Sequence, residues 1–142
     1  MYSMKEVSNL TGLSYDTLKF YCNEGLIPNV KRNARNARVF DDRDLAWISS
    51  LLCLRKCGMS LKGMKEFLDL CLQGESSIDQ RLQILSQVEQ DLEDKRKKLE
   101  DSLAYVRYKQ KYYRDVKKGT ASYFSNLIPE SEGEENPLEK RK

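Results

Sequence analysis

The chain has 142 residues, of which 33% are charged and 39% hydrophobic, and its formal net charge is +3. This length predicts one compact domain or a small domain with an appendage, and the charged fraction is typical of a long solvated helix. No apolar run approaches the length of a membrane span and no signal peptide is recognisable, so we expect no membrane partner. Without a secretory signal, the four cysteines indicate reduced thiols in a cytoplasmic protein.

The first 28 residues predict two short helices joined by a turn. Ser3 and Glu6 have the spacing of a capping box, which starts a helix over residues 4–10. Ser14 is a favourable N-cap for a second helix over residues 15–24, because its hydroxyl can accept from a free N–H group of the following turn. Apolar residues in both helices have spacings that bring the helices together. This pattern is that of a helix-turn-helix.

Residues 29–40 predict a basic β-hairpin. The stretch contains four basic residues and no acidic one. Val30 and residues 38–40 predict two short strands, and the turn at 33–36 contains Asn36, a residue type that tolerates positive φ. A basic hairpin directly after a helix-turn-helix is a wing, whose tip reaches the phosphate backbone of DNA. A solvated basic loop without a partner is the alternative.

Two amphipathic helices follow the hairpin. Asp41 and Asp44 predict an acidic capping box before a helix over residues 42–57, and Ser60 predicts the N-cap of a helix over residues 61–72. A helix-turn-helix is too small to bury its own core, so these helices complete it. We therefore expect a mainly α fold in which residues 1–74 form a winged helix-turn-helix DNA-binding domain.

Residues 77–118 predict one long helix. Its apolar residues recur every seven positions, at Ile78, Leu85, Leu92, Leu99, Val106 and Tyr113. The remaining positions are mostly polar, so the helix needs a partner helix, most simply from a second copy. We expect residues 75–118 to form a coiled-coil dimerisation helix in a homodimer; folding back on its own domain is the alternative. Residues 119–142 predict a short segment and a disordered acidic tail.

This order of elements resembles the MerR family of transcription regulators. The resemblance covers roughly residues 2–118 and rests on the motifs YSMKEV at 2–7, LTGLS at 10–14, TLKFY at 17–21, EGLIP at 24–28, RVF at 38–40, DL at 44–45 and LRKCGMS at 54–60. It implies a homodimer with antiparallel long helices and one recognition helix per subunit in successive major grooves of promoter DNA. It also implies an effector-dependent kinking and untwisting of the promoter, with RNA polymerase as a further partner.

The resemblance divides the candidate DNA contacts into two sets. The second helix offers contacts to bases or the groove, namely Tyr15, Asp16, Thr17 and Lys19. The candidates for phosphate contact are Tyr21, Lys31, Arg32, Arg35 and Arg38. The family usually has Arg at the position of Lys19; Lys keeps the charge but loses bidentate geometry.

Residues 47–59 resemble the small branch of the family that senses aldehydes or nitrosative electrophiles through a cysteine thiol. The sensing cysteine of that branch falls on Cys53. A thiolate is the nucleophile, and the basic residues nearby in sequence favour it. Cys57 lies one helical turn further on and is the candidate second thiol. The alternative for Cys53 is a small buried apolar residue.

Other functions fit the sequence less well. Metal-sensing members of the family carry cysteines around the dimer helix, which are missing here, and the chain has no histidine, so we expect neither a metal nor another cofactor. The absence of a Gly-rich phosphate loop and of histidine argues against an enzyme. A coiled-coil adaptor leaves the wing unexplained. The open alternative is a regulator of the same fold without thiol sensing, controlled by a protein partner or by a small ligand at the dimer interface.

Overall fold

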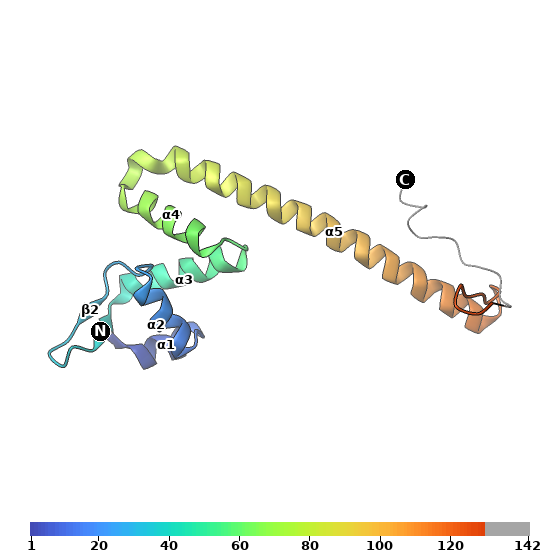
Figure 1. Cartoon of the computed structure of the whole chain (residues 1–142), viewed down its shortest axis with the longest axis horizontal. Helices are drawn as coiled ribbons and strands as arrows, with labels where there is room; N and C mark the ends of the chain where they lie inside the picture. Colours follow the sequence, from blue (N-terminus) through green and yellow to red (C-terminus); the bar gives the residue numbers. More distant parts are fainter. Residues whose placement is uncertain (130–142) are drawn as a thin grey trace. The chain divides into compact units, whose positions relative to one another are not determined.

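The computed structural model describes residues 1–129. They fall into two compact units, which divide between Leu92 and Glu93. In chain order (Figure 1), the elements are β1 (Tyr2–Ser3), α1 (Met4–Thr11), α2 (Tyr15–Asn23), β2 (Lys31–Arg32), β3 (Arg38–Phe40), α3 (Asp42–Lys56), α4 (Leu61–Leu72), a 3-10 helix η1 (Gly74–Ser77) and α5 (Ile78–Lys118). The predicted mainly α fold with a helix-turn-helix, a wing and a long final helix is confirmed. The expected acidic tail from position 130 lies outside the described residues.

Side-chain caps start the helices at the predicted places. Ser3 Oγ accepts from the backbone N–H of Glu6 at 3.1 Å, while the Glu6 carboxylate accepts from the N–H of Ser3 at 3.3 Å. Ser14 Oγ accepts from the N–H of Thr17 at 3.1 Å and so starts α2. Gly25, with φ of 74°, follows the end of this helix in the left-handed conformation that glycine adopts without strain. Hydrogen bonds between residues three positions apart therefore determine where both helices of the helix-turn-helix begin.

The wing belongs to a three-stranded antiparallel sheet with the order β1-β3-β2. Tyr2 pairs with Phe40 on one side of the sheet, and Lys31 pairs with Val39 on the other. Two details differ from the sequence-based expectation: the first strand was not predicted, and the strand expected at Val30 begins one residue later. A two-residue strand shows no alternating pattern, so only its pairing partner reveals it.

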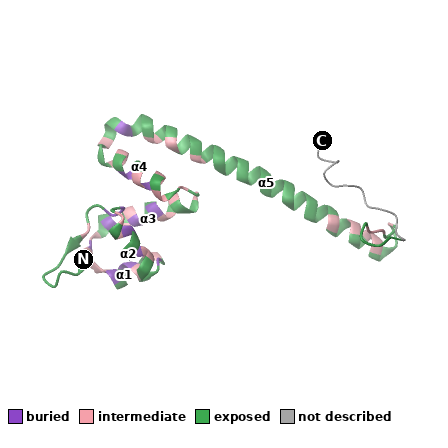
Figure 2. Cartoon of the chain, in the orientation of Figure 1, coloured by how far each residue is buried: buried purple, intermediate pink, exposed green. Residues whose placement is uncertain are grey.

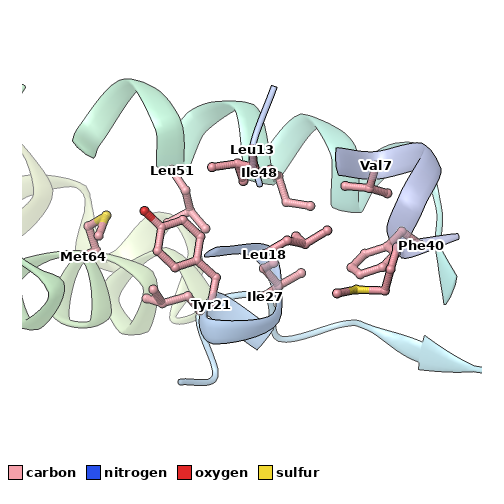
Figure 3. Packing of buried hydrophobic residues seen from close by; sticks show 11 residues of the cluster. Val7, Leu13, Leu18, Tyr21, Ile27, Phe40, Ile48, Leu51 and Met64 are labelled. Atoms are coloured by element: carbon pink, nitrogen blue, oxygen red, sulfur yellow. The ribbon is translucent and has the colours of Figure 1, made fainter. Parts of the chain in front are cut away.

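The core joins the helix-turn-helix to α3 (Figure 3). Leu18 of α2, Phe40 of β3 and Ile48 and Leu51 of α3 are all completely buried. The indole N–H of Trp47 donates to the carbonyl of Leu26 at 2.7 Å, which fastens the segment after α2 to α3. Because α3 contacts α1 and β3, and its Ile48 and Leu51 share a buried cluster with Leu18 of α2, it is the scaffold of the winged helix-turn-helix.

The long helix α5 has 41 residues and buries none of them (Figure 2). Its six apolar heptad residues, Ile78 to Tyr113, are between 38% and 66% exposed. Within the second unit, the hydroxyl of Tyr112 donates to the carbonyl of Ser122 at 2.8 Å and accepts from the N–H of Phe124 at 3.0 Å. These bonds hold the segment after Gly119 against the last turns of α5. None of the described helices is long and apolar enough to cross a membrane.

Candidate nucleic-acid interface

The recognition helix α2 has one buried face and one free face. Leu18 and Tyr21 lie on the buried face, whereas Tyr15 is 52% exposed. Asp16 and Lys19 are also exposed. Since residues three apart lie on the same side of a helix, Leu18 and Tyr21 share the buried face and Asp16 and Lys19 share the exposed one, while Tyr15 is exposed in the first turn. The structure therefore brings together the predicted base contacts from α2.

Thr17 and Tyr21 differ from the other candidates. Thr17 is only partly exposed, and its Oγ1 accepts from the Ser14 hydroxyl at 2.8 Å, so its side chain also serves the helix cap. Tyr21 was expected at a phosphate but is only 4% exposed, with its ring in the core. Its position three residues after the apolar Leu18 was the signal for burial. Its ring packs in the core and orients α2, and its contact with a phosphate stays a prediction.

Phe20 was not among the predicted contacts. It follows Lys19 on α2 and is 46% exposed, an unusual position for a large apolar ring. Its ring centroid lies 6.2 Å from that of Tyr21. An exposed aromatic ring on a recognition helix can contact sugars or the thymine methyl group. The sequence does contain this signal, since residue 20 directly follows the outward-facing residue 19.

The four basic residues of the wing have different surroundings. The Arg32 guanidinium donates to the carbonyl of Asn36 at 2.7 Å across the turn. That of Arg38 donates to Oδ1 of Asn23 at 2.6 Å, which ties β3 to the end of α2. The side chain of Arg35 is exposed at the tip, and no ion pair holds it among residues 1–129. Arg35 is therefore the wing cation best placed for a phosphate.

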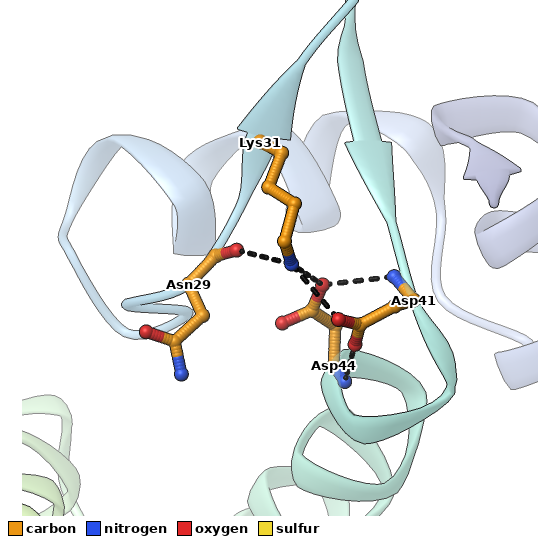
Figure 4. Close-up of polar contacts among 4 residues, drawn as sticks. All are labelled: Asn29, Lys31, Asp41 and Asp44. Atoms are coloured by element: carbon orange, nitrogen blue, oxygen red, sulfur yellow. Dashed lines mark hydrogen bonds and ion pairs between the residues drawn. The ribbon is translucent and has the colours of Figure 1, made fainter.

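Lys31 lies in an acidic corner at the base of the wing (Figure 4). Its ammonium nitrogen donates to Oδ2 of Asp41 at 2.8 Å and to the carbonyl of Asn29 at 3.2 Å, and it is 3.8 Å from Oδ2 of Asp44. The bond to Lys31 and that from the N–H of Asp44 lower the pKa of Asp41 to about 2. The bond to Asp41 raises the pKa of Lys31.

The same two acids form the predicted capping box of α3. The N–H of Asp44 donates to Oδ1 of Asp41 at 2.9 Å, and the N–H of Asp41 donates to Oδ2 of Asp44 at 2.9 Å. Asp44 is only 4% exposed. The positions of both carboxylates are thus determined by the start of α3, and Lys31 is held by groups that do not belong to the wing.

The two predicted thiols have different exposures. Cys53 on α3 is exposed and Cys57 is half-buried, as is Cys22 on α2. The alternative that Cys53 is a buried core residue is therefore wrong for the single chain. Burial raises the pKa of the Cys22 thiol and so disfavours its thiolate, although the nearby Arg38 guanidinium acts in the opposite direction. Within the part of the chain that the structure describes, no three His, Cys, Asp or Glu side chains group closely enough to hold a metal ion.

Cys53 lines an apolar pocket of about 440 Å³ in the first unit. The other lining residues come from α3, α4 and the start of α5, and are Trp47, Ser49, Ser50, Leu54, Phe67 and Leu85. A group attached to the Cys53 sulfur would therefore contact side chains from three helices.

The comparisons with known proteins give one consistent family. A family model described as MerR HTH family regulatory protein matches residues 2–71. An HTH-type transcriptional regulator from Haemophilus influenzae is 35% identical over 116 residues, which are 82% of this chain and 86% of the relative. The chain belongs to the MerR family. AdhR of Bacillus subtilis, another HTH-type transcriptional regulator, is 33% identical over 90 residues, which cover 63% of this chain and 64% of AdhR.

Solved MerR-family structures have the same architecture. The crystal structure of HiNmlR, a MerR family regulator lacking the sensor domain and bound to promoter DNA, has a TM-score of 0.71 and 35% identity, and the match covers 82% of this chain and 93% of that one. A MerR family transcriptional regulator from Listeria monocytogenes has a TM-score of 0.74 and 29% identity over 80% of this chain and 86% of its own. The present MerR-family chain is accordingly a DNA-binding transcription regulator and not an enzyme.

Proposed function

We propose that the chain regulates transcription as a homodimer on promoter DNA, and that modification of Cys53 by an electrophile changes its activity. The observation that carries the DNA-binding part is the outward face of α2, where Tyr15, Asp16 and Lys19 are exposed while Leu18 anchors the opposite face. HiNmlR, which has the same fold, is bound to promoter DNA, and this supports the same kind of target here.

In the proposed complex, α2 enters the major groove and the wing contacts the backbone. Lys19 and Asp16 are suited to base edges, because an ammonium group pairs with guanine acceptors and a carboxylate accepts from cytosine. Arg35 neutralises a phosphate without reading sequence. Contacts to bases determine the sequence specificity for the operator, and the wing adds affinity for any DNA duplex.

The second copy is proposed to pack along α5. Six apolar residues at seven-residue spacing are exposed on a helix with no buried residue, and pairing with a second α5 would cover them. We propose antiparallel packing, with residues 1–74 as the DNA-binding domain and residues 75–118 as the dimerisation helix. RNA polymerase is the further partner expected at a promoter, in the cytoplasm.

The proposed chemistry at Cys53 is addition of its thiolate to an aldehyde. The sulfur forms a bond to the carbonyl carbon, the π electrons of the C=O bond move to oxygen, and that oxygen takes a proton. The product is a hemithioacetal, which needs no oxidant. An adduct on Cys53 would occupy the pocket beside Phe67 and Leu85, and its contacts there would favour one packing of α3 against α4 and the start of α5 over another. Because α3 also carries Ile48 and Leu51 under the recognition helix, its movement would reach the DNA-binding part. Cys57 is the candidate second thiol.

DNA binding is tested by fluorescence anisotropy of labelled duplexes over a range of salt concentrations. The duplexes are the promoter region of the chain's own gene and a shuffled sequence of equal length. We expect tighter binding to the promoter and a linear decrease of log Kobs with log salt concentration. Equal affinity for both duplexes would reject sequence-specific recognition, and no salt-dependent binding would reject the DNA-binding proposal.

Thiol sensing is tested by mass spectrometry of the reduced native protein after brief exposure to limiting methylglyoxal or a nitrosothiol, with adducts counted at each cysteine. We expect Cys53 to be modified before the half-buried Cys57 and Cys71. Adducts on other thiols, with none on Cys53, would contradict the sensor proposal.

A second candidate function is a regulator of the same fold that binds a small apolar ligand without forming a bond to it. The apolar pocket beside Cys53 favours this alternative, since its volume of about 440 Å³ is typical of small-molecule sites. A Cys53→Ser variant separates the two functions. Loss of the promoter response to aldehyde in this variant supports covalent sensing, whereas a full response supports a non-covalent signal.

A further inference from the structure

The basic residue at the start of the wing does not face outward as its sequence position suggests. Lys31 was expected to contact a phosphate, yet its ammonium group lies against Asp41 and Asp44 (Figure 4). The ammonium already has two carboxylates and the Asn29 carbonyl as partners, and Arg43 lines the same pocket. A phosphate that approached Lys31 would therefore have to compete with these partners for the ammonium.

We propose that Lys31 is a positioning residue, which fastens β2 to the first turn of α3 and thereby holds Arg35 at the phosphate backbone. This inference rests on the proposed DNA binding and assigns a separate role within it. Lys31 acts through Arg35 and makes no phosphate contact of its own.

The construction of the wing explains why such an attachment is needed. The tip is a self-contained unit: Oδ1 of Asn33 accepts from the N–H of Arg35 at 2.9 Å and from that of Ala37 at 3.0 Å. The other strand, β3, is anchored by Phe40, which is completely buried. By contrast, β2 is an edge strand of two residues, and both are exposed. Backbone pairing joins β2 to β3, and the contacts of Lys31 with Asp41 and Asp44 are what attach β2 to the start of α3.

The partners of Lys31 are well suited to hold a strand in place. Asp41 and Asp44 are fixed by their reciprocal backbone bonds at the start of α3. Their carboxylates remain in position whether or not Lys31 is present. A variant that lacks the ammonium should thus release β2 while leaving the α3 cap intact, which makes the positioning role testable.

The test measures DNA affinity against salt for four variants of the full chain: Lys31→Met, Arg35→Met, the double variant and Lys31→Arg. A lost phosphate contact reduces the slope of log Kobs against log salt by about 0.9. We expect Arg35→Met and Lys31→Met each to reduce it by about this amount, because both lose the Arg35 contact. The double variant should show no further loss, and Lys31→Arg should bind like the parent.

Three results would overturn the inference. A slope reduced by about 1.8 in the double variant would mean that Lys31 and Arg35 each contact a phosphate. Parental binding by Lys31→Met would mean that the cluster does not position the wing. Equal losses in Lys31→Arg and Lys31→Met would mean that the ion pair is irrelevant.

The control Lys97→Met, at an exposed position of α5, removes one charge outside the DNA-binding unit and should leave the slope unchanged.

A measurement on the free protein distinguishes this inference from the DNA-binding proposal. Heteronuclear NOE values of the amides at residues 34–36 report motion of the tip on the picosecond-to-nanosecond timescale. We expect them to decrease in Lys31→Met and to remain parental in Lys31→Arg, while the α1 amides are unchanged in both. An unchanged tip in Lys31→Met contradicts positioning even if the parent binds DNA, and a parent that does not bind DNA refutes the proposed function itself.

Discussion

In the proposed complex, single residues of the interface divide into those that contact DNA and those that hold the contacting residues in place. Lys19 and Arg35 belong to the first group, because each has an exposed charged group without a described ion pair. Arg38 and Lys31 belong to the second group, since their charged groups are bound by Asn23 and by Asp41. Substitutions in the first group should therefore remove a DNA contact directly, whereas substitutions in the second group should displace a residue that makes one.

The first prediction concerns Lys19. In Lys19→Ala, we expect the ratio of promoter to shuffled-DNA affinity to decrease by about tenfold, since one base contact is lost. Arg35→Met should weaken binding to both duplexes by the same factor and leave that ratio unchanged. Anisotropy titrations at one fixed salt concentration measure both quantities. A proportional loss on both duplexes in Lys19→Ala would assign Lys19 to the backbone instead.

The second prediction concerns pH. The pKa of Asp41 is lowered in the folded protein from 3.8 to about 2, chiefly by the bond from Lys31. A lowered folded-state pKa stabilises the protein above the unfolded value, so this contribution is complete above about pH 4 and is lost as the pH decreases toward 2. A carbon-detected NMR titration should place the Asp41 midpoint near 2 in the parent and closer to 3.8 in Lys31→Met. Equal midpoints in the two proteins would exclude the ion pair.

At the scale of elements, the turn of the wing provides the third prediction. Asn36 has φ of 62°, a left-handed conformation that costs an ordinary side chain about 1 kcal/mol. We expect Asn36→Ala to lower the free energy of unfolding by about this amount, and Asn36→Gly to leave it unchanged or higher. Urea denaturation measures the difference. A larger loss in the glycine variant than in the alanine variant would show that the Asn36 side chain, and not its backbone angle, stabilises the turn.

Sequence reasoning was most successful where the determining interaction is local. The caps at Ser3, Ser14 and Asp41 involve partners three residues away, so their spacing was sufficient to predict them. The environment of Lys31 was not predictable, because its partner Asp41 is ten residues away and becomes a neighbour only through sheet pairing. A count of charges in the wing cannot distinguish a cation that contacts DNA from one that is already paired.

Exposure was the other property that the sequence left open. Cysteine is buried more often than tyrosine as a residue type, yet Cys53 is exposed and Tyr21 is only 4% exposed. Helical periodicity relative to Leu18 places Tyr21 in the core. For Cys53, the outcome depends on where α4 and the start of α5 pack, which no spacing within α3 determines.

At the scale of the whole molecule, the fourth prediction concerns self-association. Leu99 is 66% exposed in the single chain, and burying a leucine side chain contributes about 1.5–3 kcal/mol. Leu99→Lys removes this contribution from both copies, so we expect the dimer dissociation constant to increase by at least about a hundredfold. Analytical ultracentrifugation measures it. Asp101→Lys, two positions away and off the apolar seam, should associate like the parent; an undisturbed Leu99→Lys dimer would place the interface elsewhere.

The chain contains a single tryptophan, whose location makes it an intrinsic fluorescence probe. The indole N–H of Trp47 donates to the carbonyl of Leu26, which follows the recognition helix, and the indole lines the same pocket as Cys53. Its emission wavelength and intensity are therefore sensitive both to a group attached at the thiol and to a loosening of the helix that carries the DNA contacts. Without any label, a stopped-flow fluorescence trace could time the arrival of an electrophile, and a shift absent from Cys53→Ser would attribute that signal to one sulfur atom.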